Sequence, residues 1–228
     1  MTKTIKLLFF LPLIMICVFL GFWQIDRGNE KQVIYTAFTD KLKNSPIDYK
    51  YLEEYPDQFT RTIINGRYIT DKQFLLDNKV FEKRAGYEVI TPLVVNEKII
   101  LINRGWLYNN SRQFLPNISI KSTTDSIAGY VYYYNDNFYD LADDSYTSSW
   151  PLIIQNIEIQ KIAELLQMDV EPYVIIMNQK QVNSYDIQNI ISENPELKHY
   201  MYAGQWFLLS IIGFIFMVIL MRKENSNE

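Results

Sequence analysis

The 228-residue chain is poor in the side chains that bind metals and carry out nucleophilic catalysis. It has one histidine, His199, and one cysteine, Cys17. A structural zinc site takes about four Cys or His ligands, and a Ser-His-Asp triad needs a histidine beside its serine. The sequence therefore excludes a Cys-His zinc site and allows a triad only around His199. A single cysteine also excludes an internal disulfide.

Glycine and positive charge are scarce as well. The 8 glycines are scattered, and none belongs to a GxGxxG or GK[ST] loop of the kind that holds phosphates. The formal net charge is −4, and Lys and Arg form no basic stripe along the chain. A nucleic-acid partner is therefore not expected. Since no acid-base pair stands out either, an enzyme is the least favoured class.

Two long apolar runs stand near the ends of the chain, from Leu7 to Trp23 and from Met201 to Met221. At about 1.5 Å per residue they cover about 25 Å and about 31 Å, against a hydrocarbon core of about 30 Å. They predict transmembrane helices over residues 7–25 and 201–221. A cleaved signal peptide is the alternative for the first run, but Gly21-Phe22-Trp23-Gln24 offers no small-x-small cleavage site, so we expect an uncleaved anchor.

Flanking cations predict the orientation. Lys3 and Lys6 precede the first run, and Arg222 and Lys223 follow the second, which places residues 1–6 and 222–228 in the cytoplasm. Residues 26–200 then form an external domain, which carries 18 Lys and Arg against 24 Asp and Glu. No Arg-rich and Ser-rich transit segment precedes the first run. We therefore expect a multi-pass protein of the bacterial plasma (inner) membrane with a periplasmic central domain.

The external segment alternates between helical and strand-like patterns. The first membrane helix is expected to continue through the polar residues to Lys43. Asn135 to Ser149 is rich in Asp, Asn and Ser and is expected to be an exposed loop. Short β-branched and aromatic runs predict strands, with a hairpin at Val94 to Ile99, and the apolar spacing of Ile157 to Leu166 predicts an amphipathic helix. The expected strands are Arg61 to Tyr68, Gln73 to Leu76, Tyr87 to Val95, Ile99 to Ile102, Ile127 to Tyr134 and Pro172 to Met177.

These patterns together predict an α+β membrane protein. Its external domain is mainly antiparallel β, an open sheet or partial barrel with one amphipathic helix, and transmembrane helices flank it.

His199 is the residue whose position asks for a function. It lies two residues before the second apolar run, and helical spacing puts it on one face with Tyr202, Ala203 and Trp206. The small side chain of Ala203 would let a flat macrocycle approach, and a proximal histidine commonly holds haem iron. The alternative is an interfacial histidine within an aromatic belt.

Two arginines are further candidates. Gln24 and Arg27 leave the first run on the same side as His199, so Arg27 either pairs with a propionate of a tetrapyrrole or anchors the helix to lipid head groups. Arg104, in Asn103-Arg104-Gly105-Trp106, either braces a turn or meets an anionic group.

The ordered motifs resemble the Surfeit locus protein one family, also called Surf-one or Shy-one, over essentially the whole chain. The resemblance implies a non-catalytic membrane assembly factor for haem-copper cytochrome c oxidase that binds haem a and helps to deliver it to the catalytic subunit. The family's haem-ligating histidine maps onto His199. The motifs are Gly21-Phe22-Trp23-Gln24 with Arg27 and Lys31, Gly66-Arg67-Tyr68, Gly86-Tyr87-Glu88-Val89-Ile90-Thr91-Pro92-Leu93, Leu101-Ile102-Asn103-Arg104-Gly105-Trp106, and His199-x-x-Tyr202-Ala203-x-x-Trp206-Phe207.

The leading hypothesis is therefore a haem a carrier that works with the oxidase catalytic subunit and with the proteins that make and deliver haem a. Its expected haem site combines the His199 ligand with Arg27, Gln24 and the rings of Trp23, Tyr202 and Trp206. The runner-up is a membrane-anchored structural chaperone that stabilises an oxidase subunit without touching haem. Its motivation is a set of small residues that would admit a partner helix, namely Ala203, Gly204 and Gly213.

Overall fold

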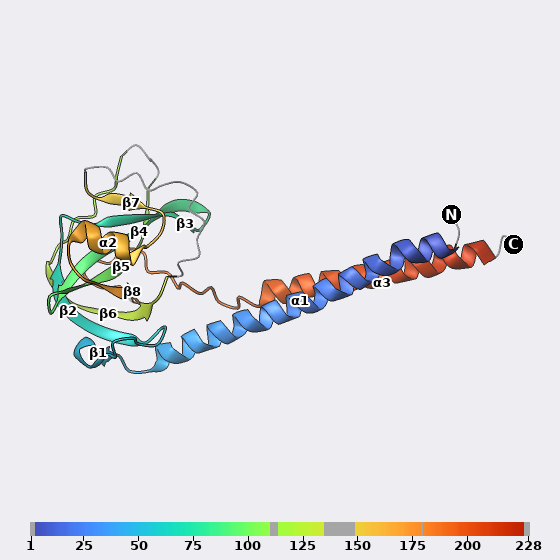
Figure 1. The fold of residues 1–228 in the computed structure, drawn as a ribbon, viewed down its shortest axis with the longest axis horizontal. Helices are drawn as coiled ribbons and strands as arrows, with labels where there is room; N and C mark the ends of the chain where they lie inside the picture. The colour runs from blue at the N-terminus through green and yellow to red at the C-terminus, as the bar shows by residue number, and fades with distance from the viewer. Residues whose placement is uncertain (1–2, 110–113, 135–148, 179, 226–228) are drawn as a thin grey trace. The chain divides into compact units, whose positions relative to one another are not determined.

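The computed structural model of the chain describes residues 3–109, 114–134, 149–178 and 180–225 (Figure 1). The loop expected over Asn135 to Ser149 therefore lies outside the described residues, apart from Ser149. The chain divides into two compact units. Met1–Asp40 and Ile191–Glu228 form the helical unit, and Lys41–Ile190 form the β unit.

The helical unit consists of long helices that are apolar enough to cross a membrane. α1 (Lys3–Lys43) and α3 (Leu197–Asn225) lie side by side and run in opposite directions, so the start of α1 and the end of α3 lie together (Figure 1). Their most apolar windows have mean hydropathies of 2.3 and 2.2, and only 11% of each window is buried. Most of these apolar side chains thus face outward, where lipid would be a better solvent than water. The expected extension of the first helix to Lys43 is confirmed.

Mostly small residues line the contact between the helices, which we call the helix seam. On α1 its members are spaced three and four residues apart, and on α3 they are seven apart, as in a coiled coil. This spacing keeps one stripe of each helix against the other. The members are Cys17, Gly21, Gln24 and Gly28 of α1 and Ala203, Ser210 and Met217 of α3.

The β unit is built on one sheet that curls back on itself. In the described part of the chain the strand order is β1-β2-β6-β8-β5-β4-β3-β7, and β2 pairs with β4 as well as with β6. The second pairing spans only Arg67↔Val94 and Tyr68↔Leu93, so the sheet closes into a partial barrel, as expected. The strands are β1 (Ile47–Asp48), β2 (Arg61–Tyr68), β3 (Phe74–Phe81), β4 (Arg84–Val95), β5 (Lys98–Tyr108), β6 (Thr124–Tyr132), β7 (Leu152–Ile154) and β8 (Val170–Met177).

The inside of the partial barrel is filled by apolar side chains from alternate positions of its strands, which is the period that a pleated strand imposes. The amphipathic helix appears as α2 (Ile159–Leu166) and buries Ile162 and Leu166. Its burial follows the three-and-four spacing that predicted it. The apolar cluster inside the partial barrel comprises Ile64, Tyr68, Leu93, Val95, Ile100, Ile102, Ile127, Val131, Tyr173, Ile175 and Met177.

The hairpin expected at Val94 to Ile99 is confirmed as the β4–β5 connection. Val95 pairs with Lys98, and Asn96 and Glu97 between them have φ values of 48° and 69°. Positive φ at both central residues is the signature of the turn whose twist matches the flanking strands. A second turn of this kind joins β3 to β4 through Glu82 and Lys83. The sequence did not reveal it, because neither residue is a usual turn former.

Some elements were not expected from the sequence. β1, β7 and the short 3-10 helix η1 (Tyr49–Tyr51) are too brief to show a period. β5–β8, β3–β7 and β1–β2 pair in parallel, so the mainly antiparallel sheet contains parallel neighbours. These pairs join strands far apart in the chain or separated by loops, and local pattern carries no information on such pairing.

Arg104 braces the β unit from inside rather than meeting an anionic group. Its side chain is 1% exposed and lies 5.0 Å from the centre of the Tyr185 ring. Nε donates to the carbonyl of Asn183 at 2.7 Å, and an Nη donates to Gln73 Oε1 at 2.9 Å and to the carbonyl of Ile118 at 3.2 Å. The acceptors are neutral, and burial lowers the pKa of the guanidinium. Arg104 therefore ties separate loops and strands together.

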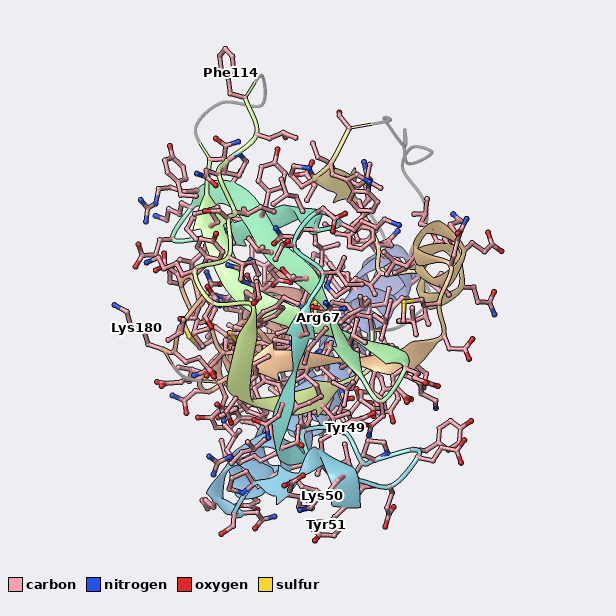
Figure 2. All side chains as sticks on the ribbon, turned by 90° about the vertical axis from the view of Figure 1, so that its left-hand side faces the viewer. Tyr49, Lys50, Tyr51, Arg67, Phe114 and Lys180 are labelled. Carbon is pink, nitrogen blue, oxygen red and sulfur yellow. The ribbon has the colours of Figure 1, made fainter. Side chains whose placement is uncertain are left out.

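Buried tyrosines make the β unit sensitive to alkali. Burial raises the pKa of Tyr130, Tyr134 and Tyr173, and the carboxylate of Glu88 adds to the effect at Tyr134. Figure 2 shows Tyr49 of η1, whose pKa is also raised by burial, beside Lys50 and Tyr51 at one end of the unit. Below pH about 10 these phenols are neutral in both the folded and the unfolded chain. Above it the unfolded chain loses their protons first, so stability falls as pH rises.

We therefore expect the β unit to unfold cooperatively as the pH is raised beyond about 10. Tyrosinate absorbance and near-ultraviolet circular dichroism, recorded on the same sample, would test this. The buried phenols should ionise together with the loss of the tertiary signal. Ionisation of all tyrosines in a gradual curve that leaves the circular dichroism unchanged would contradict the prediction.

Candidate functional site

The helical unit joins the only histidine of the chain to Gln24. His199 lies in the first turn of α3, and its Nδ1 is 2.8 Å from Oε1 of Gln24 on α1. With the Gln24 amide oxygen facing the ring, a neutral His199 carries its proton on Nδ1, because an amide oxygen only accepts hydrogen bonds. The lone pair is then on Nε2, for which the described residues provide no hydrogen-bond partner. The ring is partly exposed.

Glycines on either side of Gln24 let the helices approach at this level. A Cβ added at Gly21 would lie 2.5 Å from Cε1 of Phe207, and one added at Gly28 would lie 2.6 Å from Cε1 of Tyr200. The two aromatic rings thus lie close against glycine backbone, one helical turn to each side of Gln24. The missing side chains set the close spacing that the His199–Gln24 hydrogen bond needs.

Tyr200 adds a second polar link between the helices. Its hydroxyl donates to Oδ1 of Asn29 at 2.8 Å and also lies 3.4 Å from Oε1 of Gln32. These contacts lie on the polar side of the His199–Gln24 pair, beyond the apolar run of α1. The helix seam is therefore held by hydrogen bonds just where its apolar packing ends.

The surroundings of His199 are positively charged. The charges of Lys198, Arg27 and Lys31 all act on the ring. Arg27 does not contact His199: its Nη1 lies 2.6 Å from Oε2 of Glu30, and its side chain is 47% exposed. An exposed i,i+3 pair of this kind contributes little to stability and exchanges readily with other partners. The site thus favours an anionic ligand group.

The aromatic candidates lie at the outside of the helix pair. Trp23 is 50% exposed and Tyr202 51% exposed, while Trp206 is partly buried. Ala203 is 3% exposed and belongs to the helix seam, so its small side chain serves helix packing. Of the predicted set, the structure brings His199 and Gln24 into contact, leaves Trp23 and Tyr202 facing outward, and places Arg27 near enough to act through its charge.

Sequence reasoning assigned no contact to Tyr200, Asn29 and the two seam glycines, of which Gly21 stood only within a quoted motif. One signal was present: Cys17, Gly21, Gln24 and Gly28 alternate three and four residues apart, which is the period of a helix that packs along one stripe. All four residues are small or polar, and the first three lie within or directly beside a lipid-length apolar run. Such residues mark the side of a membrane helix that faces another helix.

His199 would be a lone protein ligand. Among the described residues, no group of three or more His, Cys, Asp and Glu side chains could hold a metal ion. An imidazole whose Nδ1–H is hydrogen-bonded and whose Nε2 is available suits an iron whose other ligands come from a macrocycle. The donor set therefore fits haem and does not fit a metal held by protein side chains alone.

Comparison with known proteins gives a consistent result. A family model described as the SURF1 family matches residues 11–211. A SURF1-like protein of Rickettsia bellii is 25% identical over 218 residues, covering 92% of this chain and 88% of the relative. One of Rickettsia conorii is 25% identical over 217 residues, covering 91% and 88%. A SURF1-like protein of Dictyostelium discoideum is 30% identical over 118 residues, which is 46% of this chain and 42% of the relative.

Proposed function

The chain belongs to the SURF1 family, and from that premise we propose that it is a non-enzymatic assembly factor of cytochrome c oxidase. In this proposal it holds haem a at the helical unit and helps to place it in the catalytic subunit of the oxidase. Haem a is cargo here, and its redox chemistry is used only in the finished oxidase. The chain's own residues bind, orient and release it.

The observation that carries the proposal is the state of His199. Oε1 of Gln24 lies 2.8 Å from Nδ1 of His199, and with the proton on Nδ1 the lone pair of Nε2 is available for iron. The positive surroundings from Lys198, Arg27 and Lys31 suit the propionates of a haem. The partly or largely exposed rings of Trp206, Trp23 and Tyr202 supply apolar surface for the macrocycle.

We further propose that α1 and α3 cross the plasma membrane of a bacterium. The candidate spans are Leu8–Lys43 and Leu197–Arg222, and the antiparallel arrangement puts both chain ends on one side (Figure 1). Cations at both ends of the chain favour the cytoplasm for that side, with the β unit in the periplasm. His199 then lies at the outer edge of the bilayer, where it can reach both haem and a membrane-embedded oxidase subunit.

Replacing His199 with alanine tests the proposal. The protein would be purified in detergent from cells that make haem a, and its reduced-minus-oxidised spectrum would be compared with that of the unchanged protein. Because the iron loses its protein ligand, we expect at least about a tenfold loss of bound haem. Loss of a group that only supports a metal ligand already lowers metal affinity by about 10- to 100-fold. Gln205→Ala, an exposed change on the same helix, should leave the haem content unchanged.

Equal haem content in His199→Ala and the unchanged protein would contradict the ligand assignment. A strain carrying only His199→Ala that still assembles spectrally normal oxidase would favour the structural chaperone instead. That alternative retains one supporting feature, since a Cβ added at Gly204 meets nothing within 4 Å and leaves room for a partner helix.

A further inference from the structure

We propose that Gln24 is a positioning residue, which selects the imidazole tautomer of His199 and so sets how strongly this histidine binds iron. The inference rests on the proposed function, because it assigns a role beside the haem ligand. Gln24 would act on the iron only through the side chain of His199. The test of its role therefore includes a measurement on haem-free protein.

With the amide oxygen of Gln24 facing His199, the hydrogen bond between them requires the proton of the neutral imidazole on Nδ1. Oε1 of Gln24 lies 2.8 Å from Nδ1, a normal length for an N–H···O hydrogen bond. Without this acceptor the ring would be free to adopt the Nε2–H tautomer, which free histidine prefers and which has no lone pair to offer at Nε2. Gln24 therefore keeps the outward nitrogen in the form that can bind a metal.

Gln24 is itself held in place by the packing around it. The rings of Phe207 and Tyr200 lie against Gly21 and Gly28, the seam residues on either side of Gln24. The Tyr200 hydroxyl also donates to Asn29. Because the helices are packed together on both sides of Gln24, its amide has little freedom to move away from the imidazole ring. A side chain that is held by its neighbours orients its hydrogen-bond partner best.

The chemistry of glutamine suits a carrier. A carboxylate that accepts from Nδ1–H makes the other nitrogen a stronger ligand, because it shares the positive charge that the ring gains on binding iron. A neutral amide gives the same orientation with a weaker electronic effect. Gln24 thus favours the binding-competent tautomer without making haem binding so strong that transfer to the oxidase would be slow.

The first test uses the fact that the chain has one histidine. Haem-free protein with 15N-labelled histidine and a histidine-free affinity tag gives a single imidazole spin system, whose nitrogen shifts and couplings report the tautomer. We expect the Nδ1–H form in the unchanged protein and in Gln24→Glu, and a shift to the Nε2–H form in Gln24→Leu. Gln205→Leu, an equally apolar change on the exposed side of α3, should leave the spectrum unchanged.

The second test measures haem. Gln24→Leu should bind haem about 10- to 100-fold more weakly, as removal of a ligand's supporting hydrogen bond usually does. Gln24→Glu should bind it more tightly, release it more slowly to an acceptor such as apomyoglobin, and raise the Fe–His stretching frequency in the resonance Raman spectrum. A stretch that is identical in all three proteins would overturn the proposal.

The outcomes separate the positioning role from the function it serves. An Nδ1–H tautomer that persists in Gln24→Leu overturns the role of Gln24, even where His199→Ala has lost its haem. Haem retained by His199→Ala overturns the ligand assignment, even where the tautomer responds to Gln24. Circular dichroism of Gln24→Leu checks that the helices form, and Gln24→Glu keeps the acceptor if the leucine variant does not fold.

Discussion

Replacing Arg104 with methionine is expected to lower the free energy of unfolding of the β unit by roughly 3–5 kcal/mol. The methionine fills much of the volume but donates no hydrogen bond. The carbonyls of Asn183 and Ile118 would then lose the guanidinium as a donor, and Oε1 of Gln73 would keep only the hydroxyl of Thr91. A buried acceptor that loses its donor costs about 1–3 kcal/mol, and this one side chain donates to more than one buried acceptor.

Urea unfolding of the full chain in detergent, followed by near-ultraviolet circular dichroism, measures this loss. Arg67→Met is the matched control: Arg67 is an exposed arginine of β2, labelled in Figure 2, and its replacement should change stability by no more than about 0.5 kcal/mol. Arg104→Lys should recover only part of the loss, because an ammonium group cannot reproduce the planar fork of donors. A loss below about 1 kcal/mol in Arg104→Met would show that water replaces the guanidinium at little cost.

Replacing Gly21 with leucine is expected to open the helix seam and to abolish most of the haem binding that we propose. A Cβ at this position would lie 2.5 Å from the ring of Phe207, and a leucine extends well beyond its Cβ. Helices in contact lie about 8–10 Å apart depending on the side chains between them, so an increase of about 2 Å is expected. That increase is enough to break a 2.8 Å hydrogen bond between His199 and Gln24.

Pulsed electron paramagnetic resonance measures the separation of the two helices directly. Spin labels at Phe19 and Ile212, both exposed positions, would be introduced in a Cys17→Ser background with and without Gly21→Leu. Gly204→Leu controls for adding a leucine to a membrane helix, since a Cβ there meets nothing within 4 Å. An unchanged distance with normal haem content in Gly21→Leu would mean that Phe207 moves aside and that the close approach is not required.

Periodic features of the chain were predicted well from the sequence. The long apolar runs, the strands such as Arg61 to Tyr68, the hairpin at Asn96-Glu97 and the amphipathic helix at Ile162 and Leu166 all follow from local chemistry, and each is present. Family membership was also predictable, because motif order survives in the linear sequence. Haem binding stays a prediction, for which His199→Ala and Gln24→Leu provide the tests, and the partners and the cellular location stay predictions as well.

The contacts that define the site were out of reach of such reasoning. His199 and Gln24 stand 175 residues apart, and only the antiparallel pairing of α1 with α3 makes them neighbours. The role of Arg104 was likewise left open by the sequence. Its acceptors at Gln73 and Asn183 are far from it in the chain and come together only in the folded β unit. The residues of a chain carry their propensity to be helix, strand or membrane span, because these depend on near neighbours. Which distant side chains share a hydrogen bond depends on packing, and packing is a property of the whole folded chain.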